Sequence, residues 1–201
     1  LPGFSVGNTF ANPDLQPAFV QSCAGGVQLG FFPDRLNFDG TYAYSDSKGQ
    51  IIPISTSYAT GYSNAYVNAG RVTNKTIELS LRAIAVRSTD WTWNVGINYS
   101  HYDNKVVELL QGLNEVPLGG YANSAYIYAV KGEAYPVIKT TSYLRDPQGR
   151  IVVDGTTGYP KKSGSLLNQG QTNAPTNVGF NTSVRYKNFT LAGQIDYRTG
   201  N

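Results

Sequence analysis

Three stretches of this chain each contain two runs of alternating apolar and polar residues separated by a tight turn. The stretches are Val27–Ser45, Thr76–Tyr102 and Val178–Arg198, with turns at residues 33–35, 87–90 and 186–188. A period of two places successive side chains on opposite faces of a β-sheet, whereas a helix would need apolar residues at i, i+3, i+4 and i+7. The sequence therefore predicts three antiparallel β-hairpins, each with one apolar and one polar face.

The length of these runs favours strands that cross a membrane. Soluble strands usually have roughly 5 or 6 residues, whereas a tilted membrane-spanning strand needs about 9 to 11. Long polar segments at residues 46–71 and 103–177 connect the hairpins. Tight turns on one side and long loops on the other are typical of an outer-membrane β-barrel. No run of about 18 apolar residues is present, so no transmembrane helix is expected.

Aromatic residues gather at both ends of the runs. Beside the tight turns lie Phe31, Phe32, Trp91, Trp93, Tyr186 and Phe189, and near the other ends lie Tyr42, Tyr44, Tyr99, Tyr102 and Tyr197. Two such belts fit the preference of Tyr and Trp for the membrane–water interface. Aromatic residues are also common in soluble sheets, so the belts support the membrane interpretation without establishing it.

The composition agrees with a barrel and argues against some partners. Charged residues make up 14% of the chain, below the roughly 25% usual for soluble domains. The net charge is +3 and the basic residues are scattered, so we expect no nucleic-acid partner. Cys23 is the only cysteine, which excludes a disulfide within the chain.

The chain is expected to be one part of a longer protein. It contains no Met, and Leu1-Pro2-Gly3 lacks the basic and apolar regions of a signal peptide. About six strands are also too few to close around an open lumen, and unpaired strand edges in hydrocarbon cost several kcal/mol per group.

The candidate functional residues fall into two groups. Charged residues expected on the polar, lumen-facing side are Asp39, Glu78, Arg82, Arg185, Asp196 and Arg198. Tyrosines expected to contact substrate or a partner from the long extracellular loops are Tyr58, Tyr62, Tyr66, Tyr126, Tyr128 and Tyr135. Lumen residues can tune selectivity, but they can also simply satisfy one another and the enclosed water. Tyr rings suit sugar stacking or peptide binding, but they can equally pack the loops together.

No catalytic, cofactor or metal site is expected. His101 has no Ser, Cys or second His at a recognisable spacing. Asp39 and Glu78 lie on separate strands, and nothing in their spacing indicates a glycosidase pair. The segments at Asp146 and Asp154 lack the 12-residue spacing of a calcium loop and are interpreted as β-turns.

Five motifs, among them Leu29–Leu36 and Asn68–Leu81, give the chain a resemblance to the SusC/RagA family of TonB-dependent outer-membrane transporters. The most specific is Asn68–Leu81, which is similar to the family segment N-A-G-x-x-x-N-K-G-I-E-L-x-L. The other four, in matching order and spacing, are Asn12–Pro17, Leu29–Leu36, Trp93–Ser100 with Asn104–Val107, and Arg185–Leu191 with Asp196–Gly200. Together they cover nearly the whole chain.

This resemblance implies a fold and a role. Residues 1–201 would form part of the C-terminal half of a barrel of about 22 strands, with the plug domain and the terminal strands absent from this chain. Such proteins of Bacteroidota import bulky nutrients, oligosaccharides or peptides, across the cell outer membrane. The implied partners are a SusD-like lipoprotein at the surface and the TonB complex, which acts through the missing N-terminal region, besides membrane lipid around the barrel.

Two other classes stay open from the residues themselves. One is a soluble, secreted β-sandwich that binds glycans, and the other is an outer-membrane barrel enzyme. A sandwich would bury its apolar faces and be recovered without detergent, whereas a barrel segment would turn them to lipid. An enzyme would need a catalytic constellation that the sequence does not display.

Overall fold

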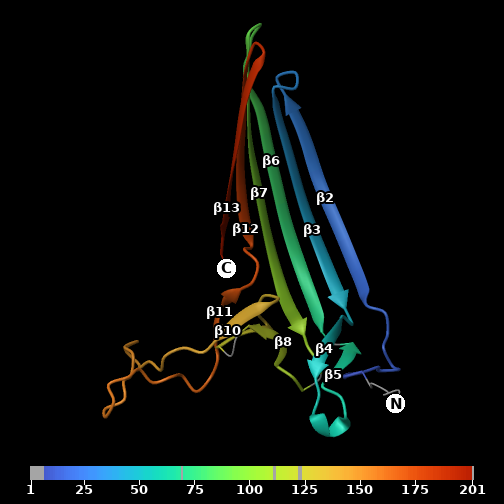
Figure 1. The fold of residues 1–201 in the computed structure, drawn as a ribbon. Coiled ribbons are helices and arrows are strands. Elements are labelled where there is room, and N and C mark those ends of the chain that lie inside the picture. Colours follow the sequence, from blue (N-terminus) through green and yellow to red (C-terminus); the bar gives the residue numbers. More distant parts are fainter. Residues whose placement is uncertain (1–6, 69, 111, 122–123, 201) are drawn as a thin grey trace, which may run out of the picture. The chain divides into compact units, whose positions relative to one another are not determined.

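The computed structural model describes residues 7–68, 70–110, 112–121 and 124–200, and these form β-strands and one short 3-10 helix (Figure 1). Among them, no helix has both the length and the apolar character needed to cross a membrane. The chain divides into two compact units. The six-stranded unit contains residues 20–47, 72–105 and 173–201, and the loop unit contains residues 1–19, 48–71 and 106–172.

The six-stranded unit is one sheet in which neighbours in sequence are neighbours in space. Its order is β13-β12-β7-β6-β3-β2. The strands are β2 (Phe19–Phe31), β3 (Leu36–Lys48), β6 (Arg71–Arg87), β7 (Trp91–Glu108), β12 (Thr176–Tyr186) and β13 (Phe189–Thr199). This up-and-down order confirms the three predicted hairpins, and strands of 11 to 18 residues are long enough to span a bilayer.

The tight turns are held by backbone hydrogen bonds. Arg35 N donates to Phe32 O at 3.1 Å in the first turn, and Ser88 N donates to Trp91 O at 2.7 Å in the second. In the third, Lys187 has a φ of 51° and its N–H donates to Asp90 O of the neighbouring turn at 2.8 Å. A left-handed residue in a two-residue turn matches the twist of the flanking strands. These short connections fix the register of every hairpin.

Among the residues that the structure describes, none of the buried apolar side chains belongs to the six-stranded unit. Its apolar face carries exposed side chains such as Ile97 (47% exposed), Ile195 (70%) and Leu191 (78%). All buried apolar residues among those described belong to the loop unit: Ile52, Ala65, Val106, Leu109, Val116, Ala129 and Val137. A soluble sandwich would cover the apolar face with a second sheet. Long strands with an outward apolar face are instead the arrangement of a membrane barrel wall.

Cross-strand pairing gathers the aromatic residues into rows. Tyr186 pairs with Trp91 on one side and Phe189 on the other, and the Trp91 and Tyr186 rings are 4.5 Å apart. Val178 is flanked by Tyr99 and Tyr197 in the same way. Eight residues separate the two rows along β12, or about 27 Å at the usual rise of a strand. With the usual tilt of about 40°, that length approaches the height of the apolar band of outer-membrane barrels.

The long connections are more ordered than the sequence suggested. The first contains β4 (Ile51–Ser55), the 3-10 helix Tyr58–Thr60 and β5 (Asn64–Asn68). β5 pairs with β4 on one side and with β1 (Thr9–Phe10) on the other, which makes a three-stranded sheet. The second contains a four-stranded sheet whose strands are β8 (Glu115–Tyr121), β9 (Ala125–Val130), β10 (Val137–Thr140) and β11 (Leu167–Gln171). The apolar runs of these strands are too brief to predict strands from sequence, yet they supply most of the buried apolar residues described in the loop unit.

Candidate functional site

The predicted lumen residues share the polar face of the six-stranded sheet, and three of them, Asp39, Glu78 and Asp196, line one groove. Arg185 pairs with Thr92, and its Nη2 lies 3.4 Å from the Thr92 hydroxyl. Asp196 pairs with Gly179, two residues along from the pair of Arg198 with Asn177, so both charges share the face of Arg185. On the other strands, Arg82 donates to Asp39 at 2.9 Å.

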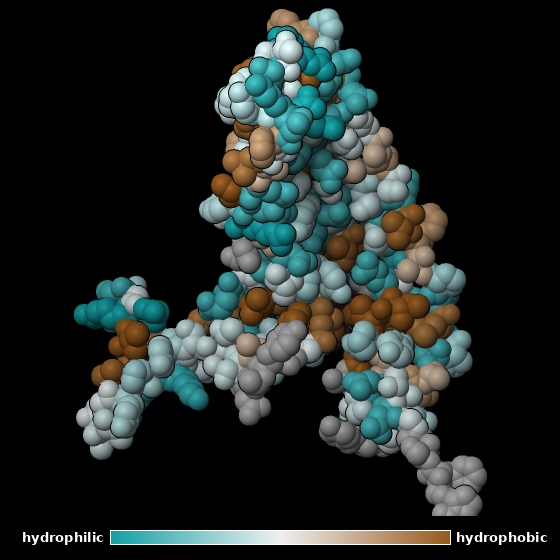
Figure 2. All heavy atoms as spheres, turned by 45° about the horizontal axis from the view of Figure 1, so that its top comes forward, coloured by the Kyte–Doolittle hydropathy of each residue, from teal (hydrophilic) through white to brown (hydrophobic). Residues whose placement is uncertain are grey.

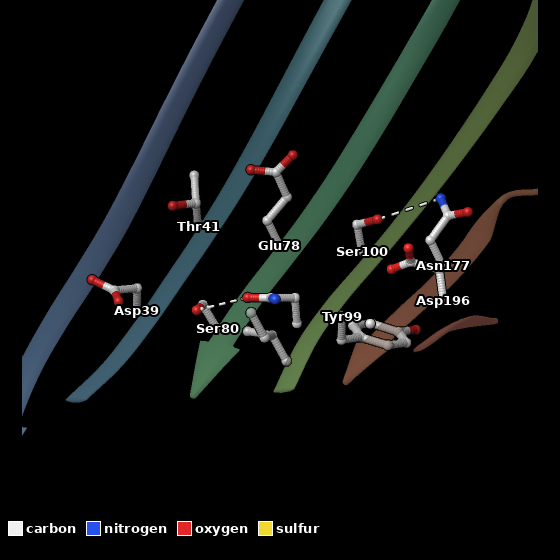
Figure 3. Close-up of a pocket in the computed structure, with 11 residues that line it drawn as sticks. Asp39, Thr41, Glu78, Ser80, Tyr99, Ser100, Asn177 and Asp196 are labelled. Atoms are coloured by element: carbon white, nitrogen blue, oxygen red, sulfur yellow. Dashed lines mark hydrogen bonds between the residues drawn. The ribbon is translucent and has the colours of Figure 1, made fainter. Parts of the chain in front are cut away.

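A shallow groove of about 350 Å³ lies on this face (Figure 3). It is lined by Asp39, Thr41, Glu78, Leu79, Ser80, Asn98, Tyr99, Ser100, Asn177, Gly179 and Asp196. Ser80 donates to Asn98 Oδ1 at 2.9 Å, and the Asn177 amide lies 3.4 Å from the Ser100 hydroxyl. The groove therefore offers hydroxyls, amides and carboxylates, which suit a polar, neutral or cationic ligand better than an anion.

Sequence reasoning selected the charged members of this groove and missed its neutral ones. Ser80, Asn98 and Asn177 occupy the same alternation positions as the charged residues. Their positions in the alternation place them on the polar face. Short polar side chains are common on such a face, so nothing in the sequence marks them as part of a groove.

Two glycines leave room for the polar side chains of neighbouring strands to lie over the backbone of the sheet. A Cβ at Gly96 would be 2.5 Å from Asn181 Oδ1, and a Cβ at Gly179 would be 3.0 Å from Asp196 Oδ1. The Asn181 and Asp196 side chains thus use the space that a side chain at these positions would fill. Gly179 and Asp196 both line the groove, so the second of these contacts lies within it.

The charged side chains at the groove are partly or fully exposed. In the Arg82–Asp39 ion pair the two side chains are 64% and 28% exposed, so the pair contributes little to stability. Asp196 accepts from the Gln194 amide at 3.1 Å. Glu78 forms no hydrogen bond or ion pair with the residues that the structure describes. Its carboxylate points into the groove (Figure 3).

Three of the predicted loop tyrosines lie in strands, Tyr66 in β5 and Tyr126 and Tyr128 in β9, and the other three lie outside the strands. Tyr62 packs edge-on against Phe10 with ring centres 5.5 Å apart, and Tyr66 of β5 is 44% exposed. Tyr126 and Tyr128 occupy alternate positions of β9 and so share one face of the four-stranded sheet. The side chain of Tyr58 lies outside what the structure describes.

Tyr128 and Tyr135 are partly engaged within the loop unit. Lys139 Nζ is 5.1 Å from the centre of the Tyr128 ring and also pairs with Glu115, so one face of that ring is covered. Partial burial raises the pKa of the Tyr135 hydroxyl above its ordinary value, which keeps this group protonated. Tyr66 remains the most accessible of the predicted tyrosines whose side chains are described.

The side-chain amide of Asn68 links the motif Asn68–Leu81 to the motif Asn12–Pro17. Asn68 Oδ1 accepts from Gln16 N at 2.7 Å, and Asn68 Nδ2 donates to Gln16 O at 2.6 Å and Gly49 O at 2.8 Å. Gly70 has a φ of 93°, and a Cβ there would be 3.1 Å from Glu108 O. These contacts explain the side-chain amide and the glycine of the Asn68–Gly70 motif, whose middle residue lies outside the described residues.

The described residues contain no group of three or more His, Cys, Asp or Glu side chains arranged to hold a metal ion. His101 Nδ1 lies 2.8 Å from the hydroxyl of Thr176, the residue of β12 that pairs directly with His101 of β7. This histidine therefore serves the pairing of β7 with β12.

The long strands, the exposed apolar face and the polar groove define a section of a transmembrane β-barrel wall. A family model described as "TonB dependent receptor-like, beta-barrel" matches residues 2–200. The chain therefore belongs to the TonB-dependent receptor β-barrel family, and the predicted fold class is confirmed.

Relatives and solved structures agree with this assignment. The chain is 24% identical to TonB-dependent receptor P3 of Formosa agariphila, over 90% of this chain and 20% of that protein. It is 22% identical to TonB-dependent receptor SusC of Bacteroides thetaiotaomicron, over 94% of this chain and 21% of that protein. The structure of the RagAB peptide transporter matches 95% of this chain and 22% of that chain, with a TM-score of 0.75 and 18% identity. The chain thus spans about a fifth of the length of these proteins.

Proposed function

We propose that this chain forms part of the wall of a TonB-dependent transporter that imports a bulky nutrient across the outer membrane. The observation that carries the proposal is the opposition of the two sheet faces, with exposed apolar residues on one and the polar groove on the other. Lipid would cover the apolar face, and cargo would pass the polar one. Family membership supports the same role.

The proposed cargo is an oligosaccharide or a peptide. The groove offers amide, hydroxyl and carboxylate groups, which hydrogen-bond equally well to sugar hydroxyls and to peptide groups. A structural relative is described as a peptide transporter, which favours testing peptides beside sugars. The role is transport without catalysis, in keeping with relatives named as receptors and transporters.

The proposed transporter would act with two protein partners. A SusD-like lipoprotein would capture cargo at the surface, and the TonB complex would act through a plug in another part of the protein. The two outer strands of the sheet, β2 and β13, would pair with further strands of the barrel.

Growth of the parent organism tests the transport role. Deleting the gene should abolish growth on one oligomeric nutrient while leaving growth on its monomers unchanged. The intact protein should also require detergent for extraction and co-purify with a surface lipoprotein. Unchanged growth on a wide panel of glycans and peptides, or recovery in the aqueous fraction, would contradict the proposal.

A further inference from the structure

The apolar face of the six-stranded sheet contains a shallow hollow of about 420 Å³. It lies over β2, β3 and β6, three strands that run side by side in the sheet (Figure 1). Gly25 and Val27 of β2 and Gly40 and Tyr42 of β3 line it, and they alternate along their strands with residues of the polar face. The hollow is therefore separate from the polar groove, which opens on the other face.

Glycines at two positions form the floor of this hollow. Nothing lies within 4 Å of where a Cβ of Gly25 would be, so the space beside it is open. A Cβ at Gly40 would be 3.2 Å from the Phe38 ring and 3.4 Å from Leu79 Cδ2, and Gly40 is buried beside these two side chains. Glycine inside a strand weakens the strand and often marks a place where a ligand approaches the backbone closely.

The walls of the hollow are apolar. The side chains of Val27, Tyr42, Ile77 and Leu79 border it, and each is between 39% and 49% exposed. None of the described residues that line it is charged. Figure 2 shows hydrophobic residues, in brown, uncovered at the surface of the molecule. An uncharged apolar hollow complements a hydrocarbon chain and would leave a charged ligand group unpaired.

The hollow is continuous with the surface that lipid covers in the proposed function, on which this inference rests. Beyond β6 the same face continues through Ile97 of β7, Phe180 of β12 and Ile195 of β13. The strands on both sides of Gly40 belong to this chain, so a further strand at the outer edge of β2 would be separated from Gly40 by the width of β2. The floor at Gly40 therefore opens toward the membrane.

The position of the floor along β3 indicates the leaflet from which a lipid reaches it. Gly40 lies four residues after the first residue of β3 and eight before its last, so it is nearer to the tight turns than to the long loops. The leaflet on the turn side of an outer membrane consists of phospholipids, whereas lipopolysaccharide occupies the leaflet on the loop side. A chain from the turn side thus has the shorter path to the floor.

We propose that the hollow over Gly25 and Gly40 binds one fatty acyl chain of a phospholipid from the turn-side leaflet. A chain in the hollow contacts the floor and the walls at once, whereas a chain on the rest of the face contacts protein on one side. Dispersion contacts are individually weak and add up with their number. This phospholipid therefore stays with the protein when the surrounding bilayer lipid is exchanged for detergent.

Retention of phospholipid by the whole protein in detergent tests this. Gly25→Leu fills the hollow with a side chain whose Cβ meets no other atom within 4 Å. After the same detergent wash, native mass spectrometry should find at least about tenfold less bound phospholipid in this variant, because displacing roughly two methylene groups of the chain is enough for that loss.

Gly193→Leu is the matched control. Gly193 lies at an apolar-face position of β13, has equally open space beside it and does not line the hollow. Its variant should retain as much phospholipid as the unchanged protein. Equal retention in the Gly25 and Gly193 variants, or no retained phospholipid in the unchanged protein, overturns the proposal.

A phospholipid that carries a diazirine in one acyl chain locates the contact in the unchanged protein, so this measurement does not depend on a variant that assembles. Crosslinks concentrated at residues 38–42 and 77–79 support the proposal. Even labelling of the whole apolar face, or retained lipopolysaccharide in place of phospholipid, overturns it. Either result leaves the import function intact if the protein still supports growth on its nutrient, whereas recovery of the whole protein without detergent would contradict the proposed function itself.

Discussion

At the scale of single residues, the most informative side chain is Asn68. Its amide is bonded at both ends to Gln16 and also reaches Gly49, residues far from it in sequence. The two motifs that it joins are recognisable from sequence, but their contact is not. The amide is needed because one group must both accept from an N–H and donate to carbonyls.

Replacing Asn68 by Ala should loosen this junction without unfolding the sheet. The loss of three hydrogen bonds at a half-buried site should cost about 1–3 kcal/mol of local opening free energy. Amide hydrogen exchange of residues 14–18 and 49–50 should accelerate about tenfold or more, since ~1.4 kcal/mol is a factor of ten.

Asn64→Ala is the matched control for this change. Asn64 lies on the same strand, and within the described part of the chain its side-chain amide bonds only to the adjacent Ser63 hydroxyl. Equal exchange in the two variants would show that the Asn68 amide does not hold the junction.

At the scale of elements, alternation decides the environment of each side chain. Ile97 and Asn98 are neighbours on β7, yet Ile97 lies on the apolar face opposite Phe180 and Asn98 lines the groove. If lipid covers the apolar face, the same charge should have opposite consequences at the two positions.

Ile97→Arg should impair assembly and Asn98→Arg should not. An Arg on the lipid face near the middle of the bilayer costs about 2–4 kcal/mol, whereas a lumen-facing Arg stays hydrated. Denaturant titration of the whole protein folded into lipid vesicles measures the difference. Similar midpoints for the two variants would argue against a lipid-facing side.

The turn at residues 146–150 of the loop unit should depend on the carboxylate of Asp146. In Asp146→Ala, Gln148 N and Arg150 N lose their acceptor and the Arg150 side chain loses its ion partner. Trypsin should then cut after Arg150 several-fold faster. Asp14→Ala, which removes an exposed carboxylate elsewhere in the loop unit, should leave the rate unchanged.

The same turn should be sensitive to acid. Because the hydrogen bond from Arg150 N lowers the pKa of Asp146 in the folded turn, its stabilisation is complete above the ordinary Asp pKa of about 3.9 and is lost as pH falls through the lowered value. Hydrogen exchange at residues 148 and 150, corrected for intrinsic rates, should be steady from pH 6 to about pH 4 and faster below. Steady protection down to about pH 2 would contradict this cause of order.

At the scale of the whole molecule, the sheet needs neighbours at both sides. β2 and β13 each pair on one side among the described strands, and every residue of both strands is exposed. In hydrocarbon, unpaired backbone groups are too costly to persist. We therefore expect both outer strands to be paired in the whole protein.

Hydrogen exchange of the whole protein in detergent tests this pairing. Amides of β2 and β13 should be protected to the same degree as those of β7 and β12. In a sample of residues 1–201 alone, the outward amides of the two edge strands should exchange much faster. Fast exchange at these strands in the whole protein would show that the sheet remains open there.

Prediction from sequence succeeded where one local rule decides the outcome. The alternation in β12 and β13 fixed the faces of Arg185, Asp196 and Arg198, because side-chain direction follows from position in a strand. It failed for the loop unit. The strands there are short, and their pairing depends on residues distant in sequence, such as Val137 opposite Tyr128.

The sequence by itself determined the three hairpins, the two faces of the sheet and the family to which the chain belongs. These rest on periodicity and on motifs, which are properties of neighbouring residues. Only the tertiary structure decided that Asn68 joins two motifs, that Lys139 covers Tyr128, and that isolated bridges join the segments of residues 142–163. Those contacts form between distant segments, where geometry in space selects among many pairings that the sequence pattern allows equally.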